Sequence, residues 1–381
     1  MPISRRNLLH HLGAGAAANA ALSPMRGFCL SAVLPPSRAG RPAGPIHLDR
    51  NENAYGPSEK AVAAMREGTS LANRYPDSEW DGLANSIAQA HGVAPEQVVL
   101  GCGSSEILRL ATTTFLSRGK KLVMASPTWR LMAEFARSSG AEVVGARLDQ
   151  HYAHDLTAML DRIDSSTGLV YVCNPNNPTG SLTRRDDLIT FIHRVPSTVY
   201  IVIDEAYYDY VGETSRDASL IDHGGDDGRV IVTRSFSGIY GLAGLRVGYG
   251  IAAPRTAALL AAGRLPCGVN VVAARAAVAA LGDAEHVRVC VQQNANDRQE
   301  FLNHVNGRML RAIDSHTNFV MLNTGQRADE VVEHFRKNNI ILPRPFPPLD
   351  KYVRVSLGAR EDMDEFWRVW DLLPPRQVMS M

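Results

Sequence analysis

Short apolar runs without alternating polar positions place the strongest limit on how this chain can fold. These runs are Lys121–Ala125, Glu142–Ala146, Leu169–Cys173, Tyr200–Asp204 and Val230–Thr233. Stretches with a helical pattern separate several of them, for example residues 131–139 and 184–193. Apolar strands separated by helices are typical of a mainly parallel sheet that is covered on both faces. We therefore expect an α/β fold with three layers around such a sheet.

A second, smaller domain is expected after the last of these runs. A long helical stretch near residues 271–305 is broken near Gly282, and strands at 319–322 and 352–356 then alternate with helices. This mixture predicts an α+β domain at residues 276–381, following a large domain at 46–275, with residues 46–60 contributing to the small one. A chain of 381 residues that is 45% hydrophobic is long enough for two such cores.

The charge balance and the cysteines exclude some classes of function. Lys and Arg total 40 and Asp and Glu total 39, so the net charge of +1 leaves no basic field for nucleic acid. The five cysteines are scattered without paired spacing, so we expect no metal site and no disulfide framework.

The amino terminus has the pattern of an export signal. Arg5 and Arg6 precede a weakly hydrophobic Ala/Gly-rich stretch, which predicts a twin-arginine signal peptide at 1–24 and a Pro/Arg/Gly-rich linker at 25–45. The apolar stretch is too short to be a membrane span. We expect a bacterial protein that the twin-arginine machinery exports to the periplasm or beyond. The alternative is an Arg-rich leader without an export role, and then a cytoplasmic location.

Polar residues follow several predicted strands, where open α/β sheets bind their ligands. Gly103, Ser104 and Ser105 open a helix, and such a turn offers backbone N–H groups and hydroxyls to an anion. Asn177 lies in a loop made rigid by Pro175 and Pro178.

Charged residues near the ends of the next two strands indicate the kind of ligand. Asp204 ends an apolar strand, and a buried carboxylate needs a cation or hydrogen-bond donors, so it could hold a protonated heterocyclic nitrogen. Arg246 follows Ser235 and Ser237 and is suited to grip a phosphate with two hydrogen bonds. Any one of these residues is more often structural, but the ordered set indicates a ligand site.

Together these motifs resemble the pyridoxal-phosphate-dependent aminotransferases of fold type I, class I/II, and especially the histidinol-phosphate aminotransferase branch. The likeness runs from about Ile46 to Leu372 and includes the segments that begin at Asn51, Asn174, Asp204 and Arg234. It implies a transaminase with a small-molecule amino donor and acceptor. A homodimer is also implied, because Tyr55 in that family reaches the phosphate of the neighbouring subunit.

The resemblance also implies a role for each matching residue. Gly103, Ser104, Ser105, Ser235, Ser237 and Arg246 would hold the cofactor phosphate. Trp129 would stack on the pyridine ring, where the family more often has Tyr or Phe. Asn177 and Tyr207 would bind the ring hydroxyl, Asp204 would pair with the ring nitrogen, and Arg354 would bind the carboxylate or phosphate of the substrate.

One position departs from the family pattern. Gly238 follows Ser237, where the family has the lysine that links covalently to the cofactor and then moves protons. The flanking residues match without a gap, and no lysine lies between Lys121 and Lys337. We therefore expect non-covalent binding of pyridoxal or pyridoxamine phosphate, with space beside the reactive carbon of the cofactor.

Three interpretations of Gly238 remain open. In the first, another base supports turnover, with Tyr207, Tyr240 and His316 as candidates. In the second, the protein binds the cofactor or an amino-acid adduct outside the cytoplasm without catalysis. In the third, the lysine of an ordinary transaminase was lost through engineering or a sequence error.

Overall fold

The computed structural model describes residues 44–212 and 218–374. The leader expected at 1–24 and nearly all of the linker expected at 25–45 lie outside the described residues. All described residues belong to one compact unit that begins at Gly40. Within them, no helix is both long enough and apolar enough to cross a membrane.

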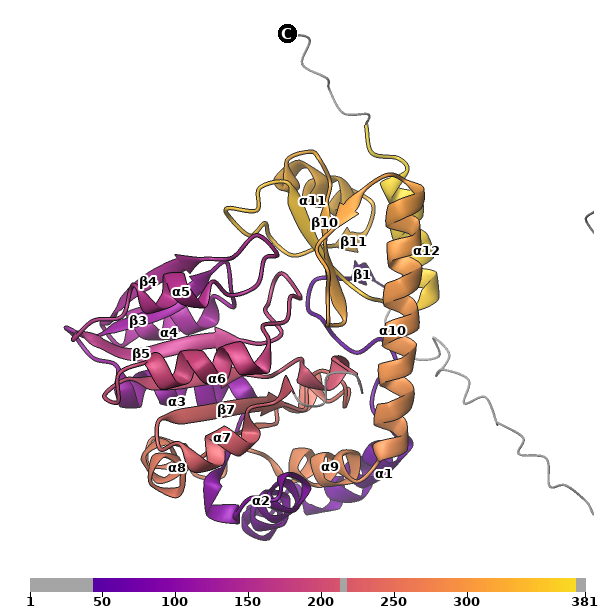
Figure 1. Cartoon of the computed structure of the whole chain (residues 1–381). Coiled ribbons are helices and arrows are strands. Elements are labelled where there is room, and N and C mark those ends of the chain that lie inside the picture. Colours follow the sequence, from indigo (N-terminus) through magenta and orange to yellow (C-terminus); the bar gives the residue numbers. More distant parts are fainter. Residues whose placement is uncertain (1–43, 213–217, 375–381) are drawn as a thin grey trace, which may run out of the picture. The chain divides into compact units, whose positions relative to one another are not determined.

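A seven-stranded sheet forms the centre of the described part of the chain (Figure 1). Its strands, in spatial order, are β2 (Val98–Gly101), β8 (Gly248–Ala252), β7 (Val230–Ser235), β6 (Tyr200–Asp204), β5 (Thr167–Cys173), β3 (Lys121–Ser126) and β4 (Glu142–Arg147). β8 is antiparallel to both of its neighbours, and the other pairs are parallel. The expectation of a mainly parallel sheet is confirmed.

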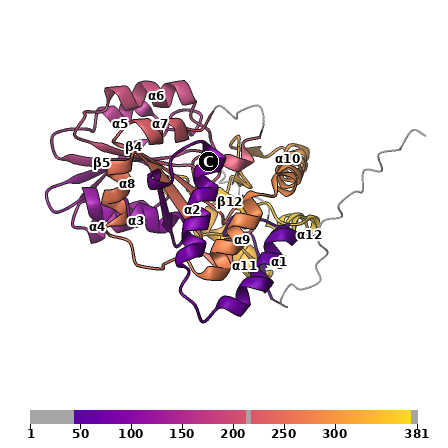
Figure 2. The ribbon, with the colours of Figure 1, turned by 90° about the horizontal axis from the view of Figure 1, so that it is seen from below.

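Helices cover both faces of this sheet (Figure 2). One face packs against α3 (Ser104–Phe115), α4 (Leu131–Ser138) and α8 (Pro254–Ala261). The other packs against α2 (Asp77–His91), α5 (Leu156–Leu160), α6 (Arg185–Arg194), α7 (Ile221–Asp226) and α9 (Val271–Leu281). Successive residues of β5 enter the two cores in turn, because side chains alternate across a strand. All seven residues of β5 are buried, which explains its continuous apolar sequence.

The C-terminal part has a separate hydrophobic core. A three-stranded antiparallel sheet, in the order β12 (Tyr352–Ser356), β10 (Phe319–Asn323) and β9 (Arg311–Ala312), packs with α10 (Ala284–Gly307), α11 (Ala328–Lys337) and α12 (Arg360–Trp370). Leu48 from the beginning of the described chain enters this core, and β1 (Ile46–His47) pairs with β11 (Ile340–Ile341). The amino-terminal segment therefore lies beside the small C-terminal sheet.

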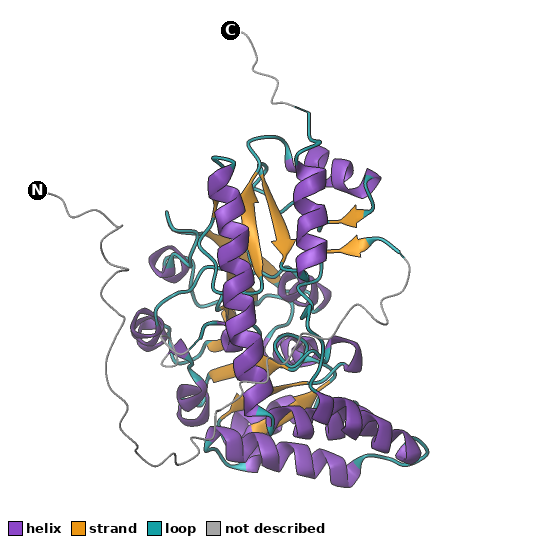
Figure 3. Ribbon diagram, turned by 90° about the vertical axis from the view of Figure 1, so that its right-hand side faces the viewer, coloured by secondary structure: helices purple, strands orange, loops and turns teal. Residues whose placement is uncertain are grey.

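Two further helices connect these parts. α1 (Glu59–Gly68) packs along α9. α10 is the long helix along one side of the described chain (Figures 1 and 3). It contacts β9 and also η3, a short 3-10 helix at Tyr208–Tyr210 that follows β6. Segments that are distant in sequence therefore meet near the carboxyl end of β6.

Candidate functional site

The carboxyl ends of β5, β6 and β7 lie side by side and bring the predicted polar residues together. Cys173 at the end of β5 pairs with Asp204, and Asp204 pairs with Thr233 of β7. The loop that contains Asn177 follows β5, and Ser235 ends β7. Parallel strands end at the same edge of a sheet, so these groups share one region.

Asp204 is buried, with 3% of its surface exposed, and is surrounded by donors. Its Oδ2 accepts a hydrogen bond from the Tyr171 hydroxyl at 2.8 Å, and its Oδ1 accepts one from the Thr233 hydroxyl at 2.9 Å. Burial raises the pKa of Asp204, whereas these two donors and the Ala206 N–H lower it. No Lys, Arg or His among the described residues forms an ion pair with this carboxylate. A protonated ring nitrogen would therefore suit it.

Tyr207 is at the centre of a second cluster of polar groups. Its hydroxyl accepts hydrogen bonds from Asn177 Nδ2 at 3.0 Å and Asn51 Nδ2 at 2.9 Å. The Asn177 amide is oriented by Arg354 Nη1, which donates to Asn177 Oδ1 at 2.6 Å. Because Tyr207 accepts from both amides, its own proton remains free to donate to the oxygen of a ligand.

Arg354 is held rigidly in this cluster. Only 4% of its surface is exposed, and its guanidinium lies 5.3 Å from the Phe319 ring centre and 5.2 Å from that of Phe346. Burial lowers the pKa of Arg354. Its Nη2 is bound to the Asp49 carbonyl, and its Nε has no hydrogen-bond partner among the described residues.

Arg246 and the start of α3 lie together at the anion site that the sequence predicted. Arg246 Nη1 donates to the Ser237 hydroxyl at 3.2 Å, and no carboxylate among the described residues pairs with this arginine. Gly103 has a φ of +73°, which favours glycine, and the absence of a Cβ leaves room for Arg246 Nη2 beside it. Gly103 is the N-cap residue of α3. Ser104 and Ser105 lie in the first turn, where their N–H groups are suited to an anion.

Ser235 supports this anion site from the end of β7. It is 8% exposed, and its hydroxyl accepts a hydrogen bond from the Ser237 backbone N–H at 3.1 Å. The expected phosphate-binding groups therefore fit a phosphate by their chemistry: hydroxyls, helix N–H groups and one guanidinium without an acidic partner.

The two predicted aromatic contacts have different surroundings. Trp129 lies just after β3 and packs, partly buried, against the core that includes α3 and α4. The Tyr55 hydroxyl donates to Asp297 Oδ2 of its own chain at 2.5 Å. Its contact with a neighbouring subunit stays a prediction.

Gly238 is buried, and the ring of Tyr210 lies beside it. A Cβ atom at this position would lie 3.3 Å from Tyr210 Cε2, 3.6 Å from the Ala206 carbonyl oxygen and 3.8 Å from the Tyr210 hydroxyl. These distances describe only the surroundings of a Cβ atom, so the expected space beside the reactive carbon of the cofactor stays a prediction. No residue in the sequence indicated this contact, because Tyr210 and Gly238 lie 28 positions apart.

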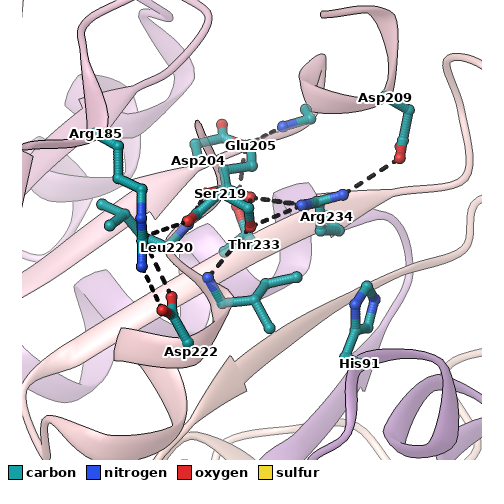
Figure 4. Close-up of polar contacts among 12 residues, drawn as sticks. His91, Arg185, Asp204, Glu205, Asp209, Ser219, Leu220, Asp222, Thr233 and Arg234 are labelled. Atoms are coloured by element: carbon teal, nitrogen blue, oxygen red, sulfur yellow. Dashed lines mark hydrogen bonds and ion pairs between the residues drawn. The ribbon is translucent and has the colours of Figure 1, made fainter. Parts of the chain in front are cut away.

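A buried ion pair fixes the ends of β6 and β7 behind the site (Figure 4). Arg234 Nε donates to Glu205 Oε2 at 2.8 Å, and Arg234 Nη1 lies 3.3 Å from Asp209 Oδ1. Burial raises the pKa of Glu205, and the positive charge of Arg234 opposes this shift. Glu205 follows Asp204, and Arg234 precedes Ser235. The ion pair therefore keeps these two site residues in fixed positions relative to each other.

A cavity of about 340 Å³ lies next to Ser237. Its lining includes Asn53, Gly56, Gly241 and Ser356 from the two sides of the molecule. A larger cavity of about 550 Å³ lies at α5 and α6, and none of the predicted site residues lines it. Of the predicted site residues, Ser237 lines the smaller cavity.

Sequence reasoning missed several residues of the site. Tyr171 and Thr233 look like ordinary strand residues, and only the fold shows that they donate to Asp204. Asn51 opened a motif that the resemblance used, but its contact with Tyr207 could not be read from the sequence.

Comparisons with known proteins show the family of this chain. The family model of the class I and II aminotransferases matches residues 43–369. The histidinol-phosphate aminotransferase of Moorella thermoacetica is 37% identical over 328 residues, which are 85% of this chain and 84% of that protein. That of Shouchella clausii is 35% identical over 327 residues, which are 84% of this chain and 87% of that protein.

Solved structures show the same fold. The histidinol-phosphate aminotransferase of Sinorhizobium meliloti, solved in complex with pyridoxal 5′-phosphate, has a TM-score of 0.81 and 26% identity, covering 87% of this chain and 92% of that one. The enzyme of Clostridium acetobutylicum has a TM-score of 0.78 and 25% identity, covering 85% and 97%. The chain therefore belongs to the class I and II aminotransferases, pyridoxal-phosphate-dependent enzymes of fold type I.

Proposed function

We propose that this chain binds pyridoxal phosphate or pyridoxamine phosphate without a covalent link and acts on an amino acid or an amino phosphate with altered turnover. The observation that carries the proposal is the contrast between two neighbouring parts of the site. Asp204 and Arg246 are arranged for a charged ring nitrogen and a phosphate, whereas Gly238 has no amine at the position of the family's lysine.

The residues divide the binding work between them. Ser104, Ser105, Ser237 and Arg246 would hold the phosphate, and Asp204 would keep the ring nitrogen protonated. Tyr207 would donate to the ring hydroxyl, since burial raises its pKa and keeps it neutral. When bound, the cofactor supplies an electron-withdrawing ring that weakens the bonds at the carbon bearing the substrate's amino group.

Arg354 would bind the anionic group of the substrate. Its guanidinium is already oriented by Asn177 and Asp49, so little side-chain entropy is lost on binding. The resemblance to histidinol-phosphate aminotransferases makes a carboxylate or a phosphate the expected group.

Borohydride reduction tests the non-covalent link. Purified protein is loaded with pyridoxal phosphate, reduced and analysed by intact and peptide mass spectrometry. We expect dialysis to remove the ligand. We also expect no stoichiometric phosphopyridoxyl group on the polypeptide. A single lysine labelled in every molecule would contradict the proposal.

A non-catalytic binding protein is the second candidate, and the absence of an amine at Gly238 favours it. Loaded protein is mixed with an amino-acid panel and 2-oxoglutarate, and keto acids are measured. Keto-acid formation above the rate of free cofactor supports an enzyme. Tight retention of the amino acid without product supports a binding protein.

We also propose that the protein is exported and forms a homodimer. Fusion of residues 1–45 to a reporter should give twin-arginine-dependent export, and replacing Arg5 and Arg6 by lysine should abolish it. Light scattering of the mature chain should give twice the monomer mass. Cytoplasmic retention of the intact fusion would contradict the export proposal.

A further inference from the structure

Tyr210 contains a buried hydroxyl that the fold itself does not use. The residue is 4% exposed, and its hydroxyl has no hydrogen-bond partner among the described residues. Leaving a buried hydroxyl without a partner costs free energy, so such a group calls for an explanation.

The position of this hydroxyl links it to Gly238. The three atoms nearest to a Cβ built on Gly238 are Tyr210 Cε2 at 3.3 Å, the Ala206 carbonyl oxygen at 3.6 Å and the Tyr210 hydroxyl at 3.8 Å. Tyr210 is the last residue of η3 and Tyr207 its N-cap residue, and Tyr207 packs against the small cluster that contains Tyr210 and Ile239. The unused hydroxyl therefore lies where the side chain of residue 238 would begin.

Other candidates for a polar group at this place are less well situated. The Tyr207 hydroxyl already accepts two hydrogen bonds, from Asn51 and Asn177. Neither Tyr240 nor His316 contributes any of the three atoms closest to the Gly238 Cβ position. Tyr210 is the phenol that the structure places against Gly238.

We propose that the Tyr210 hydroxyl hydrogen-bonds the amino nitrogen of the bound ligand, on the side where Gly238 has no side chain. This inference rests on the proposed function and names the ligand: the primary amine of pyridoxamine phosphate, or the nitrogen of an amino acid joined to the cofactor. A neutral phenol both donates and accepts, so it can serve either form of that nitrogen. Burial raises the pKa of Tyr210, which keeps the phenol neutral.

A pair of cofactor analogues tests the contact without measuring turnover. Pyridoxamine 5′-phosphate has an aminomethyl group on the pyridine ring, whereas 4-deoxypyridoxine 5′-phosphate has a methyl group at the same ring carbon and therefore no amine. Dissociation constants of both are measured by titration calorimetry for wild type and for Tyr210→Phe. Tyr200→Phe is the matched control, because Tyr200 lies at the opposite end of β6 from Asp204 and stacks on Phe115.

We expect Tyr210→Phe to weaken binding of the amine by about 2- to 12-fold, as for one hydrogen bond, and to leave binding of the methyl analogue unchanged. The ligand-free variant should be as stable to urea as wild type or more stable, since the lost hydroxyl had no partner. Tyr200→Phe should change neither affinity.

Equal affinity changes for both analogues, or no change for either, would refute the role of Tyr210. Destabilisation of ligand-free Tyr210→Phe would show a structural bond and would also refute it. If wild type binds neither analogue, the proposed function fails and this inference fails with it. If wild type binds both and the Tyr210→Phe ratio does not move, only this inference fails.

Discussion

Restoring the lysine in the variant Gly238→Lys is the sharpest test of how this site departs from its family. Gly238 does not have a positive φ, so a side chain meets no backbone strain. Its Cβ would contact Tyr210 Cε2 at 3.3 Å, which requires a shift of only a few tenths of an ångström. We therefore expect an unfolding free energy within about 1 kcal/mol of wild type, since a residue other than glycine also lowers the entropy of the unfolded chain.

We expect Gly238→Lys to gain a covalent link to the cofactor and a faster reaction. A lysine amine supplies covalent capture of the cofactor and help with proton transfer, which is worth roughly 10²–10⁴-fold in rate, or about 3–5 kcal/mol. Gly238→Lys should become labelled at residue 238 after borohydride reduction and should transfer amino groups faster than wild type by that factor. Single-turnover spectra with an amino-acid panel measure the rate.

Gly238→Ala is the matched control, because it adds the same Cβ without an amine. It should resemble wild type in both labelling and rate. If Gly238→Lys folds and binds pyridoxal phosphate but is neither labelled nor faster, residue 238 does not face the reactive carbon and the reasoning about this position is wrong.

Three further predictions concern the groups around the site. Tyr171→Phe should lower the free energy of unfolding at neutral pH by about 1.5–3 kcal/mol, since Tyr171 donates to the buried Asp204 at 2.8 Å. Losing this donor raises the pKa of Asp204 further, and a carboxyl whose folded pKa is raised loses stability as pH rises through that pKa. In urea unfolding, the free energy lost through Tyr171→Phe should therefore be smaller at a pH below the ordinary pKa of an aspartate than at neutral pH. An equal loss at both pH values would contradict this cause. Arg246→Gln should weaken pyridoxal phosphate binding about 10- to 100-fold by calorimetry, whereas exposed Arg255→Gln should not; equal effects would argue against the anion site. Glu205→Gln, which breaks the buried pair with Arg234, should cost about 3–5 kcal/mol in urea unfolding, against about 0–1 kcal/mol for Asp222→Asn in the more exposed pair with Arg185.

The sequence by itself determined the central sheet and the region of the site. Leu169–Cys173 and Tyr200–Ile203 have no charged residue because both faces of β5 and β6 are buried, and this pattern does not depend on distant contacts. The polar residues that follow these strands were predictable as a ligand site, because the carboxyl ends of parallel strands lie at the same edge of a sheet.

Only the tertiary structure decided which groups surround Asp204 and Gly238. Tyr171 and Tyr210 are both tyrosines, and the sequence does not tell which hydroxyl binds a carboxylate and which has no partner among the described residues. Hydrogen bonds and close contacts depend on side-chain direction and on segments far apart in the chain. For this reason the sequence could not show that the ring of Tyr210 packs against Gly238.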